Sequence, residues 1–416
     1  MKKIEEAIFY LFVFLVPFNV KKFLFNPLEA EPLTEFSALF LHLSDLLIIV
    51  LLSFWLIRVI KEKKGLHIKK IPLWGYFLLF FVLSLLLSLT QSQSLITSIY
   101  FLVKILLVIG LFFYLRSSLS KIKLYKSLKI IVFTGLIQSL IALGQYLDQS
   151  SLGLKYLGES LISPSLNGVA KIDLLGQKLI RAYGTFAHPN ILACFLLLTL
   201  YIAIHLSLKK ERGFIFSLPV LTLGLILTFS RAVLFTGAVS LVFFFVHKLF
   251  KEKNKSLILK TAFILCLSFS VFFLTFLPYL TERFNLNQEQ QSVSLRLFYN
   301  QASYRIIKQS PLLGVGLGNF ILKLKDFYPE IENWQIQPVH NIYLLIASEA
   351  GLISFVFFIA FLFAFLKKHF RPSIFSFLLF SFLFIGLFDH FFITINQGIL
   401  MFWLALSLLS SKKLYL

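Results

Sequence analysis

Long apolar runs separated by short charged segments dominate this chain. A bilayer core about 30 Å thick needs about 20 mostly apolar helical residues for each crossing. By that criterion, the pattern predicts an all-α polytopic membrane protein with about twelve transmembrane helices, organised as a single integral-membrane domain over residues 1–416. The expected spans lie near residues 6–20, 44–60, 73–89, 95–115, 128–147, 189–208, 214–229, 232–249, 261–278, 341–366, 373–388 and 393–410.

Two longer polar segments interrupt the apolar pattern, at about residues 148–188 and 279–340. The second is the larger and separates the ninth expected span from the tenth. All other connections are short. These two segments are therefore where we expect the protein to have room for a site outside the lipid.

Composition and charge agree with the pattern and set an orientation. The chain is 58% apolar and 14% charged, with a mean hydropathy of +0.86, which excludes a soluble globule of this length. Short cytoplasmic loops collect Lys and Arg. About two thirds of the Lys and Arg residues become cytoplasmic if the amino terminus lies inside. We therefore expect a multi-pass protein of the cytoplasmic (inner) membrane, with both termini cytoplasmic and both long segments on the external, periplasmic face.

The net charge of +21 follows from this topology. The cations are scattered over many short segments near anionic lipid headgroups, where they are favourable. They form no single basic groove of the kind that binds nucleic acid. We expect membrane lipids, and no nucleic acid, as partners.

Several unusual polar residues fall on the same external side in this orientation: Arg181, Arg231, His340 and the pair Asp389–His390. Each also has a structural interpretation. Arginines at span ends often extend to lipid headgroups, and residues at helix ends often bond to free backbone groups. Their convergence on one face is what a catalytic site requires.

Lys104 lies near the middle of an expected span. A cation at that depth costs several kcal/mol unless it has a partner or water. We expect its side chain to face the interior of the bundle. Both a structural ion pair and a role near an anionic substrate are compatible with that position.

Two other site types deserve comparison. Gly314, Gly316 and Gly318 suggest a phosphate loop, but no strand precedes them and the Lys-Ser/Thr of the Walker pattern is missing. A sharp turn with close packing is the better interpretation. A metal site is an alternative at the external histidines, although their spacing matches no metal motif. We expect neither a metal nor a cofactor.

Four motifs occur in order along the middle of the chain. They are Arg181–Asn190 (RAYGTFAHPN), Ser230–Arg231, Ser310–Phe320 (SPLLGVGLGNF) and Pro338–Gly351 (PVHNIYLLIASEAG). In content and spacing they resemble the O-antigen ligase and polymerase family over a core of about residues 180–355. The ligase pattern has a histidine followed by Asn, Ser or Gln, then nine residues and a glycine. His340, Asn341 and Gly351 fit it, whereas Ser354 stands where Gly or Thr is usual.

The resemblance implies an integral-membrane glycosyltransferase of the class C kind, inverting and independent of metal. Such an enzyme takes a glycan from undecaprenyl diphosphate on the outer face of the cytoplasmic membrane. In a ligase the acceptor is a hydroxyl of lipid A–core or a similar glycan, lipid or protein. In a polymerase it is another lipid-linked repeat unit. The His340–Gly351 spacing favours the ligase, with the polymerase as the alternative.

The resemblance and the residue chemistry together suggest roles. His340 is the expected catalytic base. The cations expected to bind the diphosphate are Arg181, Arg231, Arg296 and Arg305. The supporting residues are Asn341, Asp389, His390 and Lys104. The aromatic residues proposed to stack on sugar rings are Tyr299, Tyr304, Tyr328 and Trp334.

Two other classes of protein remain open at this point. A transporter of anions or lipid-linked glycans is compatible with about twelve spans, but transporter sites usually lie near the midplane on broken helices. A receptor or scaffold without chemistry leaves the grouped Arg and His residues unexplained.

Overall fold

The computed structural model describes residues 2–28, 35–36, 38–62, 71–118, 120–174, 177–209, 211–253, 255–284 and 290–414. Parts of the basic segment 58–70 and of both long external segments fall outside these ranges. The described chain is mostly helical, as expected, with two small antiparallel sheets of two strands each. Neither sheet is closed. The strands are β1 (Lys21–Phe25) with β2 (Leu39–His42), and β3 (Lys171–Leu174) with β4 (Gln177–Ile180).

Eight helices of the described chain are long and apolar enough to cross a membrane. They confirm a polytopic membrane protein. Seven of them are α2 (Leu43–Lys61), α4 (Leu95–Ser118), α5 (Lys121–Asp148), α6 (Pro189–Leu208), α8 (Arg231–Lys251), α9 (Ser256–Thr275) and α14 (Gly351–His369), and the eighth is α3 (Leu73–Ser88) with the short 3-10 turn that extends it to Gln91.

Shorter helices occupy the other expected spans and the first part of the tenth. These helices are α1 (Lys2–Leu15), α7 (Ser217–Leu227), α13 (Ile342–Glu349), α15 (Ile374–Ile385), α16 (Phe391–Thr394) and α17 (Asn396–Ser410). The figure of twelve crossings stays a prediction, because these helices fall below the usual spanning length.

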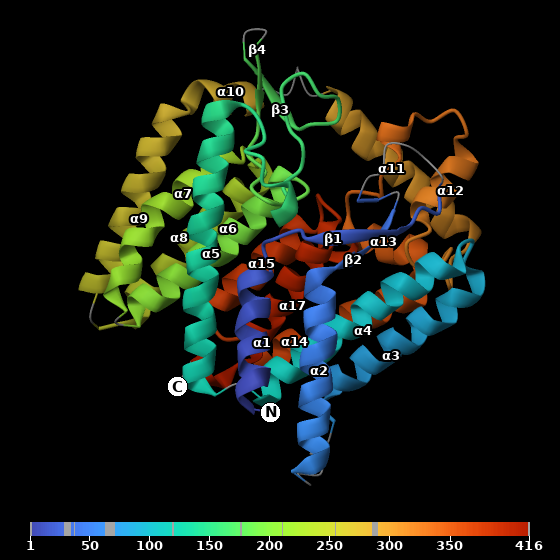
Figure 1. Cartoon of the computed structure of the whole chain (residues 1–416), viewed down its shortest axis with the longest axis horizontal. Helices are drawn as coiled ribbons and strands as arrows, with labels where there is room; N and C mark the ends of the chain where they lie inside the picture. Colours follow the sequence, from blue (N-terminus) through green and yellow to red (C-terminus); the bar gives the residue numbers. More distant parts are fainter. Residues whose placement is uncertain are drawn as a thin grey trace.

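Helix α6 lies at the centre of the bundle. Nearly all of its residues are buried, and it packs against α5, α7, α8, α15 and α17. A helix that is apolar on every side must be covered on every side, which explains this central position. Figure 1 shows both termini at one end of the bundle, and β3, β4 and α10 (Leu277–Phe284) at the opposite end.

The long polar segment before His340 is largely helical. It contains the end of α10, then α11 (Gln290–Gln309) and α12 (Phe320–Phe327). A second apolar cluster joins α11, α12 and α13 through buried residues that include Tyr299, Phe320 and Leu345. Helices α11 and α12 of this segment therefore pack against α13.

The expected tenth span, 341–366, is two helices. Helix α13 ends at Glu349, and α14 starts at Gly351, whose φ of 81° is in the left-handed region. A Cβ atom at this position would lie 2.0 Å from the carbonyl oxygen of Leu312. The break was not expected from hydropathy, because both halves are apolar. It occurs where the chain turns tightly around a neighbouring loop.

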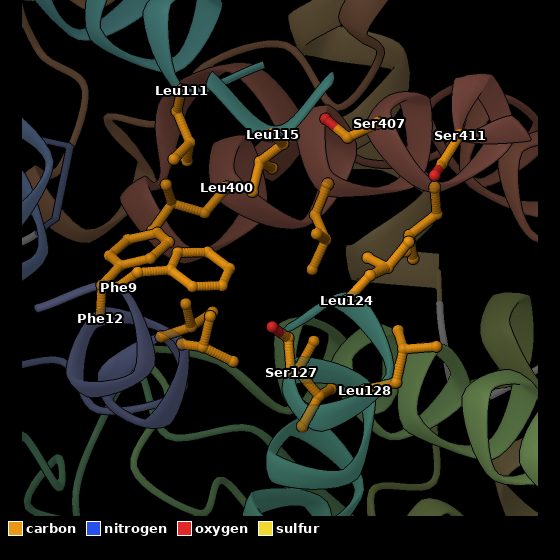
Figure 2. Close-up of a pocket in the computed structure, with 15 residues that line it drawn as sticks. Phe9, Phe12, Leu111, Leu115, Leu124, Ser127, Leu128, Leu400, Ser407 and Ser411 are labelled. Carbon is orange, nitrogen blue, oxygen red and sulfur yellow. The ribbon is translucent and has the colours of Figure 1, made fainter. Parts of the chain in front are cut away.

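A small, mostly apolar cavity lies inside the helix bundle, away from the residues proposed for the active site. It opens between α1, α4, α5 and α17, and its lining includes Phe9, Leu111, Leu128 and Leu400 (Figure 2). Its volume is about 40 Å³. Pockets for drug-sized ligands are about 300–1,000 Å³. We interpret this cavity as imperfect packing.

Candidate active site

A buried, non-helical segment between β4 and α6 carries Arg181. Two glutamines of α5 bind its backbone. The Gln145 Oε1 atom accepts hydrogen bonds from the N–H groups of Tyr183 (3.0 Å) and Gly184 (2.8 Å), and the Gln138 Oε1 atom accepts one from Thr185 (3.0 Å). Backbone polar groups away from water need such partners. The glutamines let irregular chain enter the bundle and fix the position of Arg181.

The Arg181 side chain is buried, with 3% of its surface exposed. Its Nε donates to the Thr228 carbonyl oxygen (2.7 Å), and a terminal nitrogen donates to Asn190 Oδ1 (2.7 Å). Burial, together with the positive charges of Arg231 and Arg296, lowers the pKa of Arg181 to about 10. The guanidinium therefore remains charged at neutral pH.

Asn190, in the first turn of α6, joins three segments at one point. Its Oδ1 accepts from Arg181 and from the Ser230 hydroxyl (2.9 Å), and its Nδ2 donates to Asp389 Oδ2 (2.9 Å). Sequence analysis did not assign a role to Asn190 or Ser230. The available signal was their position in the same motifs as Arg181 and Arg231.

Asp389 and His390 lie together beside this junction, and both are buried. The Asp389 Oδ1 atom accepts from the His390 backbone N–H (2.9 Å). Burial raises the pKa of Asp389, but the hydrogen bond from the Asn190 amide and the facing Arg181 and Arg296 guanidinium groups favour the charged form, so that the pKa is lowered and the group is a carboxylate. Burial lowers the pKa of His390 to about 3, so that its imidazole is neutral.

The His340 ring lies between two aromatic neighbours. The Tyr299 ring stacks on it, with centroids 5.6 Å apart and planes at 17°, and the His390 ring meets it edge to face at 5.0 Å and 82°. Asn341 caps α13 by accepting from the N–H groups of Tyr343 (2.9 Å) and Leu344 (3.1 Å). The start of a capped helix and two ring contacts thus orient the imidazole.

The protonation state of His340 suits a base. Burial lowers its pKa below the ordinary value, and Arg296 acts in the same direction, whereas Asp389 opposes them. The imidazole is therefore neutral at pH 7 and able to accept a proton.

Three guanidinium groups share this region with one carboxylate. Arg181 interacts electrostatically with Arg231, Arg296 and Asp389, and Arg296 interacts with Arg231 and Asp389. Burial lowers the pKa of Arg296. Like charges held together in a partly buried place are unfavourable without an anion. The group of Arg181, Arg231, Arg296, Asp389, His340 and His390, here called the polar cluster, therefore favours a multiply charged anion.

Two long helices point their N-termini at the polar cluster. Helix α6 starts after its N-cap His188, and α8 starts at Arg231 after its N-cap Ser230. The Ser230–Asn190 hydrogen bond shows that the two starts adjoin. Helix N-termini carry partial positive charge and free N–H groups, so they add to the attraction for an anion.

The glycine-rich loop 310–320 forms hydrogen bonds with the C-terminal end of α13. The N–H groups of Val315 and Gly316 donate to the carbonyl oxygens of Ser348 (3.1 Å) and Glu349 (2.8 Å) at the end of α13. The Glu349 carboxylate accepts from the N–H groups of Gly318 (2.9 Å) and Phe320 (3.1 Å). These bonds satisfy backbone groups at the helix break and fix the helix that follows His340.

Three residues that the sequence suggested for the site make other contacts in the structure. The Arg305 guanidinium lies over the rings of Phe327 (5.2 Å) and Tyr328 (5.8 Å). Lys104 is buried and faces the bundle interior as expected, where it binds Asp45. Tyr299 is only 1% exposed and contacts His340, so it offers no open surface for a sugar, contrary to expectation.

The remaining aromatic candidates are more accessible. Tyr304 is 62% and Trp334 is 43% exposed, and Tyr328 is half-buried. Their contact with sugar stays a prediction. Within the described ranges, no three His, Cys, Asp or Glu side chains are grouped to hold a metal ion.

One known protein family matches part of the chain. Residues 214–359 match the family model described as O-antigen ligase. This match includes Arg231, Arg296, the glycine-rich loop and His340. No curated protein matches the chain.

Proposed function

We propose that this chain, whose residues 214–359 match the family model described as O-antigen ligase, is an O-antigen ligase-like glycosyltransferase. It moves a glycan from undecaprenyl diphosphate to a hydroxyl of lipid A–core or a similar glycan, lipid or protein acceptor. The reaction takes place on the external face of the cytoplasmic membrane. The observation that carries the proposal is His340, which contacts the His390 ring, next to the grouping of Asp389 with Arg181, Arg231 and Arg296.

The arginines bind the diphosphate of the donor. A guanidinium forms charge-assisted and often bidentate bonds to phosphate oxygens. Arg231 is the first residue of α8, and Arg181 binds Asn190 in the first turn of α6. Arg296 belongs to α11 and interacts electrostatically with both. As the glycosidic bond breaks, negative charge grows on the leaving diphosphate. Cations held in place by the fold stabilise that charge without rearranging. Arg305 is a weaker candidate, because aromatic rings already cover its guanidinium.

His340 accepts the proton of the acceptor hydroxyl. The hydroxyl oxygen forms a bond to the anomeric carbon while the bond from that carbon to the diphosphate oxygen breaks. Attack opposite the leaving group inverts the anomeric centre. Tyr299 and His390 hold the imidazole in place, and Asp389 and Asn190 connect it to the arginines. Neither a metal nor a cofactor takes part in this proposal.

The polymerase is the second candidate. Ser354 departs from the ligase pattern, and in the structure its hydroxyl is buried and donates to the Ala350 carbonyl (2.8 Å) at the helix break. Its hydroxyl therefore supports the first turn of α14. A transporter is a lesser alternative. The grouping of charge at helix starts beside a neutral histidine favours chemistry over passage.

The experiment uses purified protein in detergent with undecaprenyl-diphosphate-linked repeat units. One reaction contains lipid A–core and the other contains no added acceptor. Product on lipid A–core supports the ligase, and a ladder of longer lipid-linked chains without acceptor supports the polymerase. If folded protein forms neither product, while movement of the lipid-linked glycan across vesicles is observed, the proposal is wrong and the transporter takes its place.

A further inference from the structure

A small polar cavity lies between strand β2, α4 and α16, and one of its lining residues, Thr394, contacts His390 of the polar cluster. Its volume is about 10 Å³, and its lining includes Glu35, His42, Lys104, Thr394 and Asn396. A polar cavity of about 10–15 Å³ holds one water molecule when two to four polar groups surround it. This cavity meets both conditions.

A buried ion pair forms one wall of the cavity. Lys104 Nζ binds the Asp45 carboxylate, and it also lies 3.0 Å from His42 Nδ1 and 3.2 Å from Asn396 Oδ1. The Asn396 amide in turn donates to Ser44 Oγ (2.8 Å). Lys104 is thus fully engaged in fixing α2, α4 and the start of α17 to each other.

The protonation of His42 follows from these contacts. Burial lowers the pKa of His42, so that the ring is neutral. An ammonium group has donors and no acceptor, so Lys104 donates to His42 Nδ1. The proton of the neutral ring is then on Nε2. His42 is 5% exposed, and no described residue accepts a hydrogen bond from Nε2. A buried N–H without an acceptor is costly, and a water in the cavity supplies one.

Thr394 forms the opposite wall and contacts the polar cluster. Its hydroxyl donates to the His390 carbonyl (3.2 Å) and lies 2.7 Å from His390 Nδ1. A hydroxyl has one proton to donate, so when that proton is on the bond to the His390 carbonyl, the Thr394 oxygen accepts from His390 Nδ1–H. In that arrangement the neutral His390 ring carries its proton on Nδ1, and its Nε2 has a lone pair. The second lone pair of the Thr394 oxygen is available to a water.

We propose that one buried water connects His42 Nε2–H to the Thr394 hydroxyl, and that Thr394 is a positioning residue for the histidines of the polar cluster. The connection runs from the Lys104–Asp45 ion pair through His42, the water and Thr394 to His390. The His390 ring then contacts His340. The expected effect of Thr394 on catalysis rests on the proposed function. The tautomers of His42 and His390 and the connecting water are independent of it.

Other charged groups face this connection. Glu35, Asp45 and Lys104 face His42, and Tyr100 lines the same cavity. Asp389, His340 and His188 face His390. Because the water, Thr394 and His390 are neutral, we expect loss of the Thr394 hydroxyl to change the orientation of His390 more than the charge of the cluster.

A measurement independent of activity tests the tautomers. In ¹⁵N NMR of protein labelled at histidine, the His390 signal is identified by its loss in His390→Gln and the His42 signal by its loss in His42→Gln. We expect neutral His390 protonated at Nδ1 and neutral His42 protonated at Nε2. In Thr394→Val the His390 signal should change, and in Thr394→Ser it should remain. A His390 ring protonated at Nε2 in the wild type, or an unchanged signal in Thr394→Val, overturns the proposal.

A kinetic comparison tests the positioning role. Thr394→Val keeps the shape of the side chain and removes the hydroxyl, whereas Thr394→Ser keeps the hydroxyl. We expect kcat to fall about tenfold in Thr394→Val, with KM and melting temperature nearly unchanged and with activity restored in Thr394→Ser. Equal kcat in the valine variant and the wild type overturns the positioning role. If the wild type transfers no glycan, the proposed function fails, and the NMR result still decides the hydrogen-bonded connection.

Discussion

Asn190 is the junction on which the polar cluster depends most, and Asn190→Ala tests it. The substitution removes one hydrogen bond each from Arg181, Ser230 and Asp389. All three side chains are buried. Two of the lost bonds involve charged groups, each contributing about 1.5–3 kcal/mol, and the third is a neutral bond contributing about 1 kcal/mol. The loss is therefore about 4 kcal/mol or more.

We expect this loss to affect catalysis directly, because Arg181 loses its fixed orientation toward the diphosphate and Asp389 loses its hydrogen bond to Asn190, which links it to the arginines. If half of it, about 2 kcal/mol, is lost from transition-state stabilisation, kcat/KM falls about thirtyfold. The assay is glycan transfer by purified protein at several donor concentrations. Thermal unfolding of the same samples establishes how much folded protein is present.

Asn319→Ala is a matched control. The Asn319 side chain also makes three hydrogen bonds, to Ser94 N–H (2.7 Å), Ser98 Oγ (2.7 Å) and the Leu317 carbonyl (2.9 Å). All three partners are neutral and lie outside the polar cluster. We expect a loss of stability with a smaller loss of kcat/KM per folded molecule. A fall in Asn190→Ala no greater than in Asn319→Ala would refute the reasoning.

Three further predictions concern charge, pH and the helix break. Arg231→Lys keeps the charge but not the planar fork, so it should lose most transfer activity, and full activity in the donor titration would indicate that Arg231 only reaches lipid headgroups. Because His340 and His390 have lowered pKa values in the folded protein, the unfolded chain binds more protons below about pH 6.5. Stability should thus fall as the pH is lowered from 7 toward 4, and a melting temperature that rises over this range would contradict the buried neutral histidines. Gly351→Ala places a Cβ 2.0 Å from the Leu312 carbonyl at a left-handed φ, so it should sharply reduce the yield of folded protein, which size-exclusion chromatography in detergent would measure.

The sequence predicted the parts of this protein that depend on hydropathy and on charge asymmetry. Apolar run length indicated where each long helix lies, and the cost of a cation at bilayer depth predicted that Lys104 faces the interior. The grouping of Arg181, Arg231, His340 and Asp389 was expected only as a common side of the membrane. The structure brings them into one cluster by the hydrogen bonds of Asn190, by ring contacts of His340 and by electrostatic interactions of the arginines, none of which a local pattern encodes.

The differences have physical causes. The break between α13 and α14 was missed because apolar residues continue through it, and only a glycine marks the turn. Asn190 was missed because an asparagine in the first turn of a helix is common for local reasons. Tyr299 was expected on an open surface because its segment is polar, but the fold buries it against His340. In each case the deciding contact comes from a residue distant in sequence.

Donor binding and glycan transfer measured together in His340→Ala test the central claim most directly. The donor is undecaprenyl-diphosphate-linked glycan, and both quantities are compared with the wild type in the same detergent. If the arginines bind the diphosphate and His340 removes the acceptor proton, the variant binds donor nearly as well as the wild type and transfers almost none of it. Transfer at the wild-type rate by folded His340→Ala protein would contradict the account.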